Sequence, residues 1–321
     1  MKTRKALAAC AIALATAGCG SVEAPSSVSV TPVDPLPSGA AQVTAAPAGG
    51  SADCDREASL RPGALPAPGA MPAGSTMAEI AQRGRLIVGV DQNTDLFGFR
   101  DPATGQLQGF DIDIAREMAR AIFGDPDRIQ LRVVNAKERE SVLQSGEVDL
   151  VVRTYSITCA RREKVDFSNV YYEANQKILA AKGSGIDSAA ALADKRVCAV
   201  SGTTSLSRLY ELDPRPAIFS VATWTDCLLM LQQGQVDAIS TDDAVLEGLA
   251  KQDPTVDVLG ESIAKEPYGV GVNKQRPDLV RFVNGVLEKI KADGTWQRLY
   301  DRWLLPELGP SAGPPEPRYQ D

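Results

Sequence analysis

The chain has 321 residues and a formal net charge of −7, with 34 Lys and Arg, 41 Asp and Glu, and no His. An acidic surface repels nucleic acid and anionic lipid, so neither is expected as a partner. Without His, every His-based acid, base or catalytic triad and most zinc geometries are excluded. We therefore expect no metal and no cofactor.

The first 18 residues have the pattern of a secretory signal, because basic residues precede an apolar run, 6–17, that is too short to span a bilayer. The sequence T-A-G-C that ends at Cys19 resembles a bacterial lipoprotein cleavage site, in which the cysteine becomes the N-terminus and carries lipid. Cys10 follows a similar tripeptide, but cleavage there would leave almost no apolar segment. We expect lipidation at Cys19 and an extracytoplasmic protein anchored to the outer face of the cell membrane.

Residues 19–73 are rich in Pro, Ala, Gly and Ser and contain few large apolar residues, so they cannot bury a core. They are predicted to tether a folded body to the membrane. Cys54, between two Asp residues, interrupts the tether and indicates that its end is pinned to the body. A Pro-rich tail, 306–321, is predicted at the C-terminus.

Four cysteines remain for the folded part of the chain: Cys54, Cys159, Cys198 and Cys227. An even number in an oxidising compartment favours disulfides over metal binding, and no C-x-x-C spacing is present. Four cysteines allow three pairings. The residues alone leave that choice open.

From residue 76 to residue 305, short β-rich runs alternate with helical patterns, which predicts an α/β body of parallel strands. Apolar residues at i, i+3 and i+4 spacing predict an amphipathic helix over 112–122. Further helices are expected at 206–210, at 228–231 and within 277–305. The predicted strands are 86–90, 129–134, 148–152, 197–200, 217–221 and 238–240.

An internal echo divides this body into two lobes. The sequence L-Q-S-G-E-V-D at 143–149 returns 88 residues later as L-Q-Q-G-Q-V-D at 231–237, and a weaker echo relates 86–91 to 196–201. Both echoes occur in the same order, which favours two similar lobes.

Two extended-looking runs, 175–180 and 268–272, would carry the chain out of the first lobe and back. They predict a hinge of two strands. Lobe 1 would then contain 76–178 and 270–305, and lobe 2 would contain 179–269.

Polar side chains follow the predicted strands, and in open α/β lobes ligands bind beyond the carboxyl ends of the strands. The loop 201–205 lies between a strand and a helix, where amides and hydroxyls favour an anion, although a threonine there can also serve only as a helix cap. The candidates at these strand ends are Asp91, Arg153, Thr154, Ser156 and Arg161 in lobe 1, and Ser201, Thr203, Thr204 and Asp242 in lobe 2.

Two of these candidates have charges suited to an amino acid. Arg161 could grip a carboxylate with two parallel hydrogen bonds, while a surface position beside Arg162 is the alternative. Asp242 falls in the second echo where Thr154 falls in the first, so it could accept bonds from an ammonium group. Asp242 and Asp243 could instead bind a metal, but no third ligand accompanies them.

From residue 85 to residue 305 the chain resembles the polar amino-acid-binding proteins of ABC importers (solute-binding protein family 3), and in particular actinobacterial glutamine/glutamate-binding lipoproteins. The matching signatures are 109–115, 156–158 with Arg161, 165–168, 201–205 and 241–242. The resemblance implies a two-lobed periplasmic-binding-protein (Venus flytrap) fold that closes on an amino acid and delivers it to an ABC permease. It implies a monomer and no enzymatic activity.

The resemblance also implies roles for single residues. It assigns the α-carboxylate of the ligand to Arg161 with Thr203 and Thr204, and the α-ammonium group to Asp242. Thr154 and Ser156 would add backbone or hydroxyl bonds.

Arg139 corresponds to an arginine that grips the distal carboxylate in glutamate/aspartate-binding relatives, and Arg100 and Arg153 could also reach that group. We therefore favour glutamate or aspartate as the ligand, with asparagine and glutamine as weaker ligands.

The family usually has Pro-Glu before the arginine, where this chain has Cys159 and Ala160. Disulfide pairing as in glutamate-binding relatives implies Cys198 with Cys227, and Cys54 with Cys159.

Two alternatives use the same fold. The closed protein could inform a membrane sensor and feed no importer. A periplasmic dehydratase would need a general acid over its substrate, for which only Asp91, Asp242 or Glu173 could serve.

Overall fold

The computed structural model describes residues 36–47 and 53–321. The predicted secretory signal, Cys19 and part of the predicted tether lie outside these residues, so they stay predictions. Within the described residues, no helix is both long and apolar enough to cross a membrane. Residues 36–321 form a single unit that contains two large sheets and one small one.

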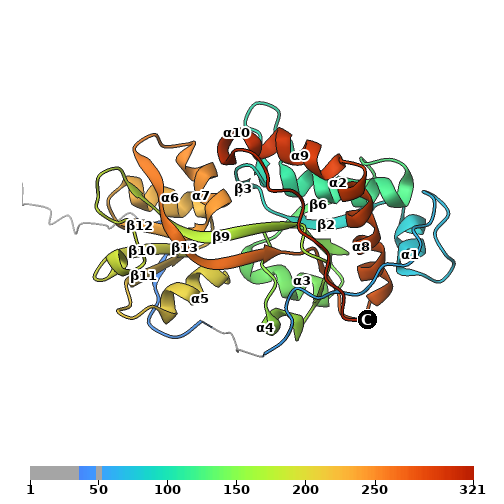
Figure 1. Cartoon of the computed structure of the whole chain (residues 1–321), viewed down its shortest axis with the longest axis horizontal. Coiled ribbons are helices and arrows are strands. Elements are labelled where there is room, and N and C mark those ends of the chain that lie inside the picture. Colours follow the sequence, from blue (N-terminus) through green and yellow to red (C-terminus); the bar gives the residue numbers. More distant parts are fainter. Residues whose placement is uncertain (1–35, 48–52) are drawn as a thin grey trace, which may run out of the picture. The chain divides into compact units, whose positions relative to one another are not determined.

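The first large sheet is the base of lobe 1 and has the order β6-β2-β7-β14-β8 (Figure 1). β2 (Leu86–Val90) runs parallel to β6 (Ile129–Val133) and to β7 (Leu150–Val151). β14 (Gly271–Val272) is antiparallel to β7 and to β8 (Asp166–Phe167).

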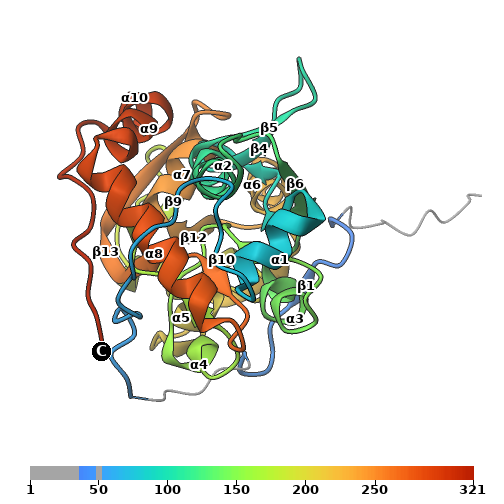
Figure 2. The same ribbon diagram turned by 90° about the vertical axis from the view of Figure 1, so that its right-hand side faces the viewer.

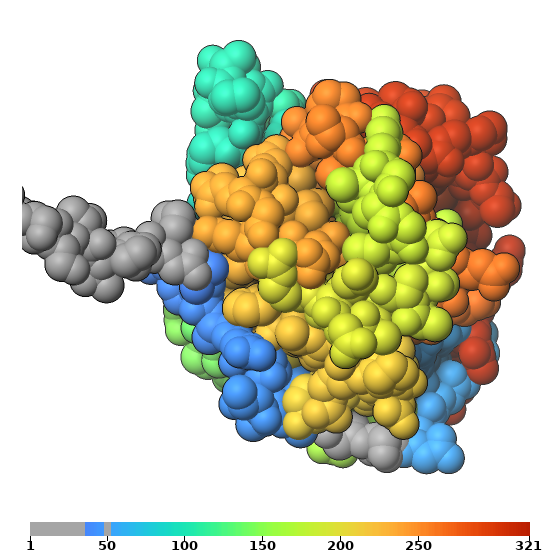
Figure 3. All heavy atoms as spheres, turned by 90° about the vertical axis from the view of Figure 1, so that its left-hand side faces the viewer, coloured from blue at the N-terminus to red at the C-terminus, as the bar shows by residue number. Residues whose placement is uncertain are grey.

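The second large sheet is the base of lobe 2 and has the order β1-β11-β10-β12-β9-β13. At its centre, β10 (Arg196–Val200) runs parallel to β11 (Ala217–Val221) and to β12 (Ala238–Asp242). β1 (Ala41–Gln42) is antiparallel to β11 at one edge. Figure 3 shows residues 36–47, in blue, lying on the surface of lobe 2.

Two long strands connect the lobes. β9 (Tyr172–Ala181) and β13 (Val256–Tyr268) pair antiparallel along their length, with one register shift between Leu259 and Ala264 (Figure 1). The expected first crossing, 175–180, lies within β9. The expected second crossing, 268–272, is misplaced, because β13 makes this crossing and ends at Tyr268. The lobe boundaries expected from the sequence stay predictions.

The two-lobed α/β fold is as expected, but both sheets are mixed and not purely parallel. A strand that returns from the other lobe enters a sheet from the opposite end. β9, which enters lobe 2, is therefore antiparallel to β12, and β14, which follows the return to lobe 1, is antiparallel to β7. β13 leaves lobe 2 beside β9 and runs antiparallel to it. Hydrophobic patterning carries no information on strand direction, so the sequence could not predict this.

Helices cover both sheets, and a three-stranded sheet of β3 (Asn93–Thr94), β4 (Gly98–Arg100) and β5 (Leu107–Gln108) lies beside lobe 1. The helices of lobe 1 are α1 (Thr76–Arg83), α2 (Phe110–Phe123), η1 (Ala136–Glu138), α3 (Arg139–Gln144), α4 (Cys159–Arg162), α8 (Pro277–Ala292), α9 (Thr295–Trp303) and α10 (Leu305–Leu308). Those of lobe 2 are η2 (Ala190–Leu192), α5 (Thr204–Glu211), α6 (Trp224–Gln232) and α7 (Asp243–Ala250).

The two copies of the internal echo make the same contact between neighbouring strands, one in each lobe. In the first copy, Asp149 Oδ2 accepts the backbone N–H of Ile87 at 2.9 Å; in the second, Asp237 Oδ2 accepts the backbone N–H of Arg196 at 2.8 Å. Each aspartate thus binds the start of the neighbouring central strand, β2 or β10. The repeated V-D therefore has a structural role in each lobe.

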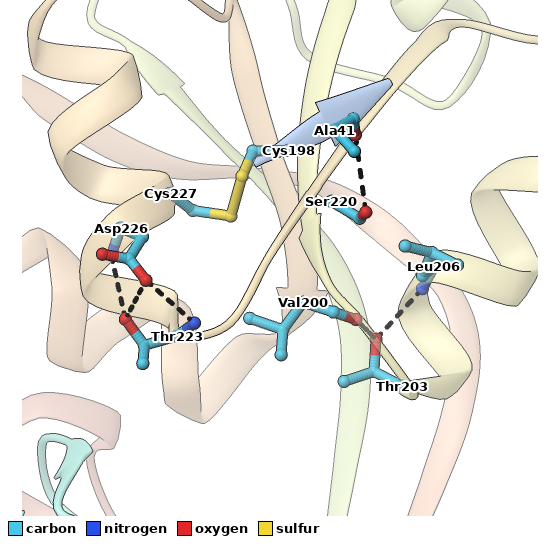
Figure 4. The surroundings of a disulfide bond; sticks show 9 residues. All are labelled: Ala41, Cys198, Val200, Thr203, Leu206, Ser220, Thr223, Asp226 and Cys227. Atoms are coloured by element: carbon cyan, nitrogen blue, oxygen red, sulfur yellow. Dashed lines mark hydrogen bonds between the residues drawn. A yellow bond between two sulfur atoms is a disulfide. The ribbon is translucent and has the colours of Figure 1, made fainter. Parts of the chain in front are cut away.

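Disulfides hold the N-terminal segment and the core of lobe 2. Cys54 pairs with Cys159 at the start of α4, and Cys198 of β10 pairs with Cys227 of α6 (Figure 4). This is the pairing that the resemblance implied.

The C-terminal tail lies beside the N-terminal segment, where Ser59 forms a parallel bridge with Tyr319 and Arg318 lies 2.8 Å from Asp55 (Figure 2). The tail and the segment around Ser59 therefore hold each other, and the Cys54–Cys159 disulfide and a bond from Ser59 Oγ to the carbonyl of Phe167 fasten them to lobe 1.

We expect the double substitution Cys54→Ala/Cys159→Ala to lower the free energy of unfolding by about 4 to 5 kcal/mol, because the disulfide joins residues 105 apart in the sequence. Cys198→Ala/Cys227→Ala, which opens a link between residues 29 apart, should cost about 3 to 4 kcal/mol. Urea unfolding followed by circular dichroism measures both losses. No loss in either variant would contradict this account of the two disulfides.

Candidate functional site

A small cavity lies where the two lobes meet. Its volume is about 10 Å³, which is room for about one water molecule. Its walls are mostly polar and come from both lobes. They are Arg139, Arg153, Thr154, Ser156 and Arg161 of lobe 1, and Thr203, Thr204, Ser205, Trp224, Thr241, Asp242 and Val245 of lobe 2.

Arg161 reaches the cavity from α4. The side chain of Thr158 caps this helix and accepts the backbone N–H of Arg161 at 3.2 Å. The guanidinium donates to the carbonyl of Ser156 at 2.6 Å and to the carbonyl of Gly202, in lobe 2, at 3.0 Å. Its Nε lies 3.5 Å from Glu140 Oε1. Arg161 therefore spans the gap between the lobes with a buried positive charge.

Arg139 begins α3 and is 2% exposed. Its Nη2 donates at 3.0 Å to the same carbonyl of Gly202, and its Nε donates to the carbonyl of Ala136 at 2.8 Å. Within the described residues, all its hydrogen bonds go to backbone carbonyls. Burial, and then the charge of Arg161, lower the pKa of Arg139 to about 9. Arg139 is still charged at neutral pH, and an anion beside it would stabilise that charge.

The ring of Tyr155 contacts both guanidinium groups. Its centroid lies 4.3 Å from Cζ of Arg139 and 5.0 Å from Cζ of Arg161, which are cation–π distances. Phe167 packs edge-on against the ring, and a Cβ on Gly271 would lie only 2.9 Å from it. The ring has no room to move, so it fixes the spacing of the two cations.

Arg153 has a charge partner of its own. Its Nη2 lies 2.9 Å from Asp91 Oδ2, and both side chains are buried. Asp91 also accepts the hydroxyl of Thr94 at 2.6 Å and the backbone N–H of Gln92 at 2.7 Å. The carboxylate of Asp91 is therefore used within lobe 1.

Thr154 has an unusual backbone conformation for a non-glycine residue, with φ of +36°. Its N–H donates to Asp111 Oδ2 at 2.7 Å, and the hydroxyl of Tyr171 donates to Asp111 Oδ1 at 2.8 Å. Burial raises the pKa of Asp111 to about 6, against the opposing effect of these hydrogen bonds. The aspartate of the 109–115 signature thus holds the end of β7 at the cavity.

Lobe 2 contributes the start of α5. Thr203 caps this helix by accepting the N–H of Leu206 at 3.2 Å (Figure 4). The hydroxyl of Thr204 donates to Glu266 Oε2 at 2.8 Å and lies 3.4 Å from Ser156 Oγ across the gap. Gly202, with φ of +79°, is necessary here because a Cβ would lie 2.7 Å from Cα of Lys137 in lobe 1.

Asp242 is the residue before α7 and supplies a carboxyl group to the cavity from lobe 2. One of its oxygens accepts the hydroxyl of Tyr268. The other, Oδ1, is buried and has no hydrogen-bond partner in the part of the chain that the structure describes. Burial, and then the charge of Glu266, raise the pKa of Asp242 well above its ordinary value. A buried acceptor of this kind favours a cationic donor.

Residues 86–306 match the family model of bacterial extracellular solute-binding proteins, family 3. The chain belongs to this family. It is therefore an extracellular solute-binding protein and not an enzyme, as expected from the resemblance. Residues 36–47 and 53–321 contain no group of three or more His, Cys, Asp or Glu side chains that could hold a metal ion.

Relatives and a solved structure support this placement. The chain is 37% identical over 230 residues to the ABC transporter glutamine-binding protein GlnH of Bacillus subtilis. The aligned region covers 71% of this chain and 84% of GlnH. It is 31% identical over 232 residues to the glutamate-binding protein GluB of Corynebacterium glutamicum, covering 68% and 78%. The solute receptor for L-cysteine of Neisseria gonorrhoeae superposes with a TM-score of 0.72 at 30% identity, covering 75% of this chain and 100% of that one.

The cavity of this solute-binding protein brings together most of the side chains expected from the sequence. Eight of them line it: Arg139, Arg153, Thr154, Ser156, Arg161, Thr203, Thr204 and Asp242.

Three expected residues do not line the cavity. Arg100 is misassigned because its guanidinium is exposed and donates to Gln92 and Gly105 within the small sheet. Asp91 forms an ion pair with Arg153, and the backbone N–H of Ser201 donates to the carbonyl of Val221.

Trp224 and Val245, which the sequence did not predict as site residues, also line the cavity, from α6 and α7. A signal for Trp224 was present. Thr223 and Asp226 form a capping box with reciprocal hydrogen bonds, which places the next residue, Trp224, at the first position of a helix that follows β11 (Figure 4). Phe97, which follows β2, is buried among other rings and does not line the cavity.

We expect ligand binding to release a proton from Asp242. The free protein retains this proton to a higher pH than an ordinary aspartate does, whereas an ammonium group requires the charged carboxylate. Affinity should then rise with pH up to the pKa of Asp242 in the free protein. Calorimetric titrations in buffers of different ionisation enthalpy measure the proton count, and binding without proton release at acidic pH would contradict this expectation.

Proposed function

We propose that this protein captures L-glutamate or L-aspartate by closure of its two lobes and delivers the ligand to an ABC permease. Asparagine and glutamine are weaker ligands in this proposal. The observation that carries it is the pair of buried guanidinium groups, Arg139 and Arg161, which converge on one carbonyl oxygen and share a cavity with Asp242, whose Oδ1 has no hydrogen-bond partner within residues 36–47 and 53–321.

The common part of every amino acid would be bound by groups from both lobes. Arg161 binds the α-carboxylate by displacing its own bond to Gly202, and Thr204 supports it at the start of α5. Asp242 binds the α-ammonium group through Oδ1, which accepts no hydrogen bond from the described part of the chain. Ser156 and Thr154 add polar contacts from lobe 1.

The charge balance favours a second carboxylate on the ligand. Three arginines line the cavity, and Asp242 is the carboxylate among its lining residues. Arg153 is paired with Asp91, and Arg161 has Glu140 nearby, but among the residues that the structure describes Arg139 donates only to backbone carbonyls. A distal carboxylate would neutralise Arg139 in a dry site, whereas a neutral amide would leave its charge uncompensated.

The relatives agree with a polar amino acid as ligand. GlnH is described as a glutamine-binding protein of an ABC transporter and GluB as a glutamate-binding protein. Their names support delivery to an ABC transporter, while the arginines of this cavity are the reason for preferring the acid over the amide. The expected lipid at Cys19 would keep the protein beside such a permease.

Calorimetric titration of the purified protein with each of the twenty amino acids tests the proposal. Glutamate or aspartate should bind most tightly, with glutamine and asparagine weaker by about tenfold or more, the discrimination of a charge-assisted bond. Binding of none of these four would overturn the function, and tight binding of glutamine without glutamate would overturn the role of Arg139.

Arg139→Ala should remove the preference for acids and leave glutamine binding within about threefold, because only the distal carboxylate loses its partner. Arg161→Ala should weaken every ligand by about a hundredfold or more, as expected for loss of a buried charge-assisted contact. Arg100→Ala is the matched control, since its exposed guanidinium lies outside the cavity. Normal binding by Arg161→Ala would place the site elsewhere.

A further inference from the structure

One face of α7 packs against lobe 1. Ala244 is fully buried and belongs to the same apolar cluster as Leu96 and Phe97 of lobe 1. Gly248 and Lys251 follow at i+4 and i+7, so the three residues lie on one side of the helix. Asp242, the candidate for the ammonium group, immediately precedes this helix.

Gly248 allows the closest approach between the lobes on this side. A Cβ at position 248 would lie 3.1 Å from the carbonyl oxygen of Asp95 and 3.2 Å from its Cβ. Glycine weakens a helix interior relative to alanine, so the helix itself does not favour it here. The contact with Asp95 gives a physical reason for its presence.

Lys251 adds two ion pairs to the contact between α7 and lobe 1. Its Nζ lies 3.7 Å from Asp95 Oδ2 and 3.6 Å from Glu307 Oε1 of α10. α6 adds one more contact, from Thr225 Oγ1 to the carbonyl of Asn93 at 3.4 Å. The loop 93–95 of lobe 1 is thus held against both helices of lobe 2.

The same loop is anchored at the ligand cavity. Asp91 accepts the N–H of Asn93 at 3.2 Å and the hydroxyl of Thr94 at 2.6 Å while it pairs with Arg153. Arg153 lines the cavity. The loop that contacts α7 is therefore attached to the site from the lobe 1 side, and α7 is attached to it through Asp242.

We propose that Ala244, Gly248 and Lys251 are positioning residues for ligand capture, which dock α7 on lobe 1 and thereby bring Asp242 over the ammonium group of the ligand. The role of Asp242 rests on the proposed function, while the docking of α7 does not need a ligand. A residue that acts only on closure changes the apparent affinity of every ligand by the same factor.

Gly248→Ala tests this directly. The added methyl opposes docking but favours the helix, so affinity for glutamate, aspartate and glutamine should fall together by about tenfold, with their ratios unchanged. The denaturant midpoint should not fall. Gly285→Ala in α8 is the control, because its Cβ would meet Leu65 of the N-terminal segment, and none of its nearest neighbours within 4 Å belongs to lobe 2. Wild-type affinity, or an altered ratio between ligands, would overturn the proposal.

Lys251→Ala should weaken all ligands by about twofold, and less so at high salt, because its ion pairs are long and half-exposed. Lys182→Ala is the control: this lysine is about as exposed as Lys251, and its pair with Asp257, at 3.6 Å, lies within lobe 2. An identical effect of both substitutions would remove Lys251 from the docking face.

A cross-link tests the docking without any ligand. In Asp95→Cys/Gly248→Cys the two Cβ atoms would lie about 3.2 Å apart, a few tenths of an ångström closer than the roughly 3.5 to 4.5 Å of a disulfide, so a small shift lets the docked full chain form this disulfide in air. Peptide mapping under non-reducing conditions detects it, and Gly248→Cys alone is the control. Failure to form the link would overturn the docking of α7. Formation of the link in a protein that binds no amino acid would refute the proposed function alone.

Discussion

The arrangement of the site depends on two buried guanidinium groups held side by side. Like charges repel strongly in a poorly solvated environment, so Arg139 and Arg161 need compensation from their surroundings. The ring of Tyr155, the backbone carbonyls and Glu140 supply part of it. An anionic ligand bound beside the two guanidinium groups would supply the remaining compensation.

Closure brings this positive pair to lobe 2 at a single point. Both guanidinium groups donate to the carbonyl of Gly202, where the backbone of lobe 1 approaches too closely for any side chain. A second close approach occurs at Gly248 on α7. Two glycines of lobe 2 thus mark where the lobes meet. A ligand between them gains contacts from both lobes only in the closed arrangement, which couples capture to closure.

Local patterns predicted what depends on local physics. The runs 86–90 and 217–221 coincide with β2 and β11, and the amphipathic spacing at 112–122 falls within α2. Strand direction in the sheets and the place of the second crossing depend on the path of the chain between the two lobes. A short stretch of sequence carries no information on that path. The same limit applies to the site. Arg100 is held away from the cavity by its hydrogen bonds to Gln92. Trp224 reaches the cavity from α6, a helix that contains none of the other candidates. The equivalence of Thr154 and Asp242, in contrast, followed from the echo, and both line the cavity.

The most direct test of this account is a crystal structure of the protein grown with L-glutamate. We predict one ligand between the lobes, with its α-carboxylate on Arg161, its ammonium group on Asp242 and its side-chain carboxylate on Arg139. A ligand bound outside this cavity, or one whose side-chain carboxylate contacts no arginine, would contradict the central claim that the paired guanidinium groups select an acidic amino acid.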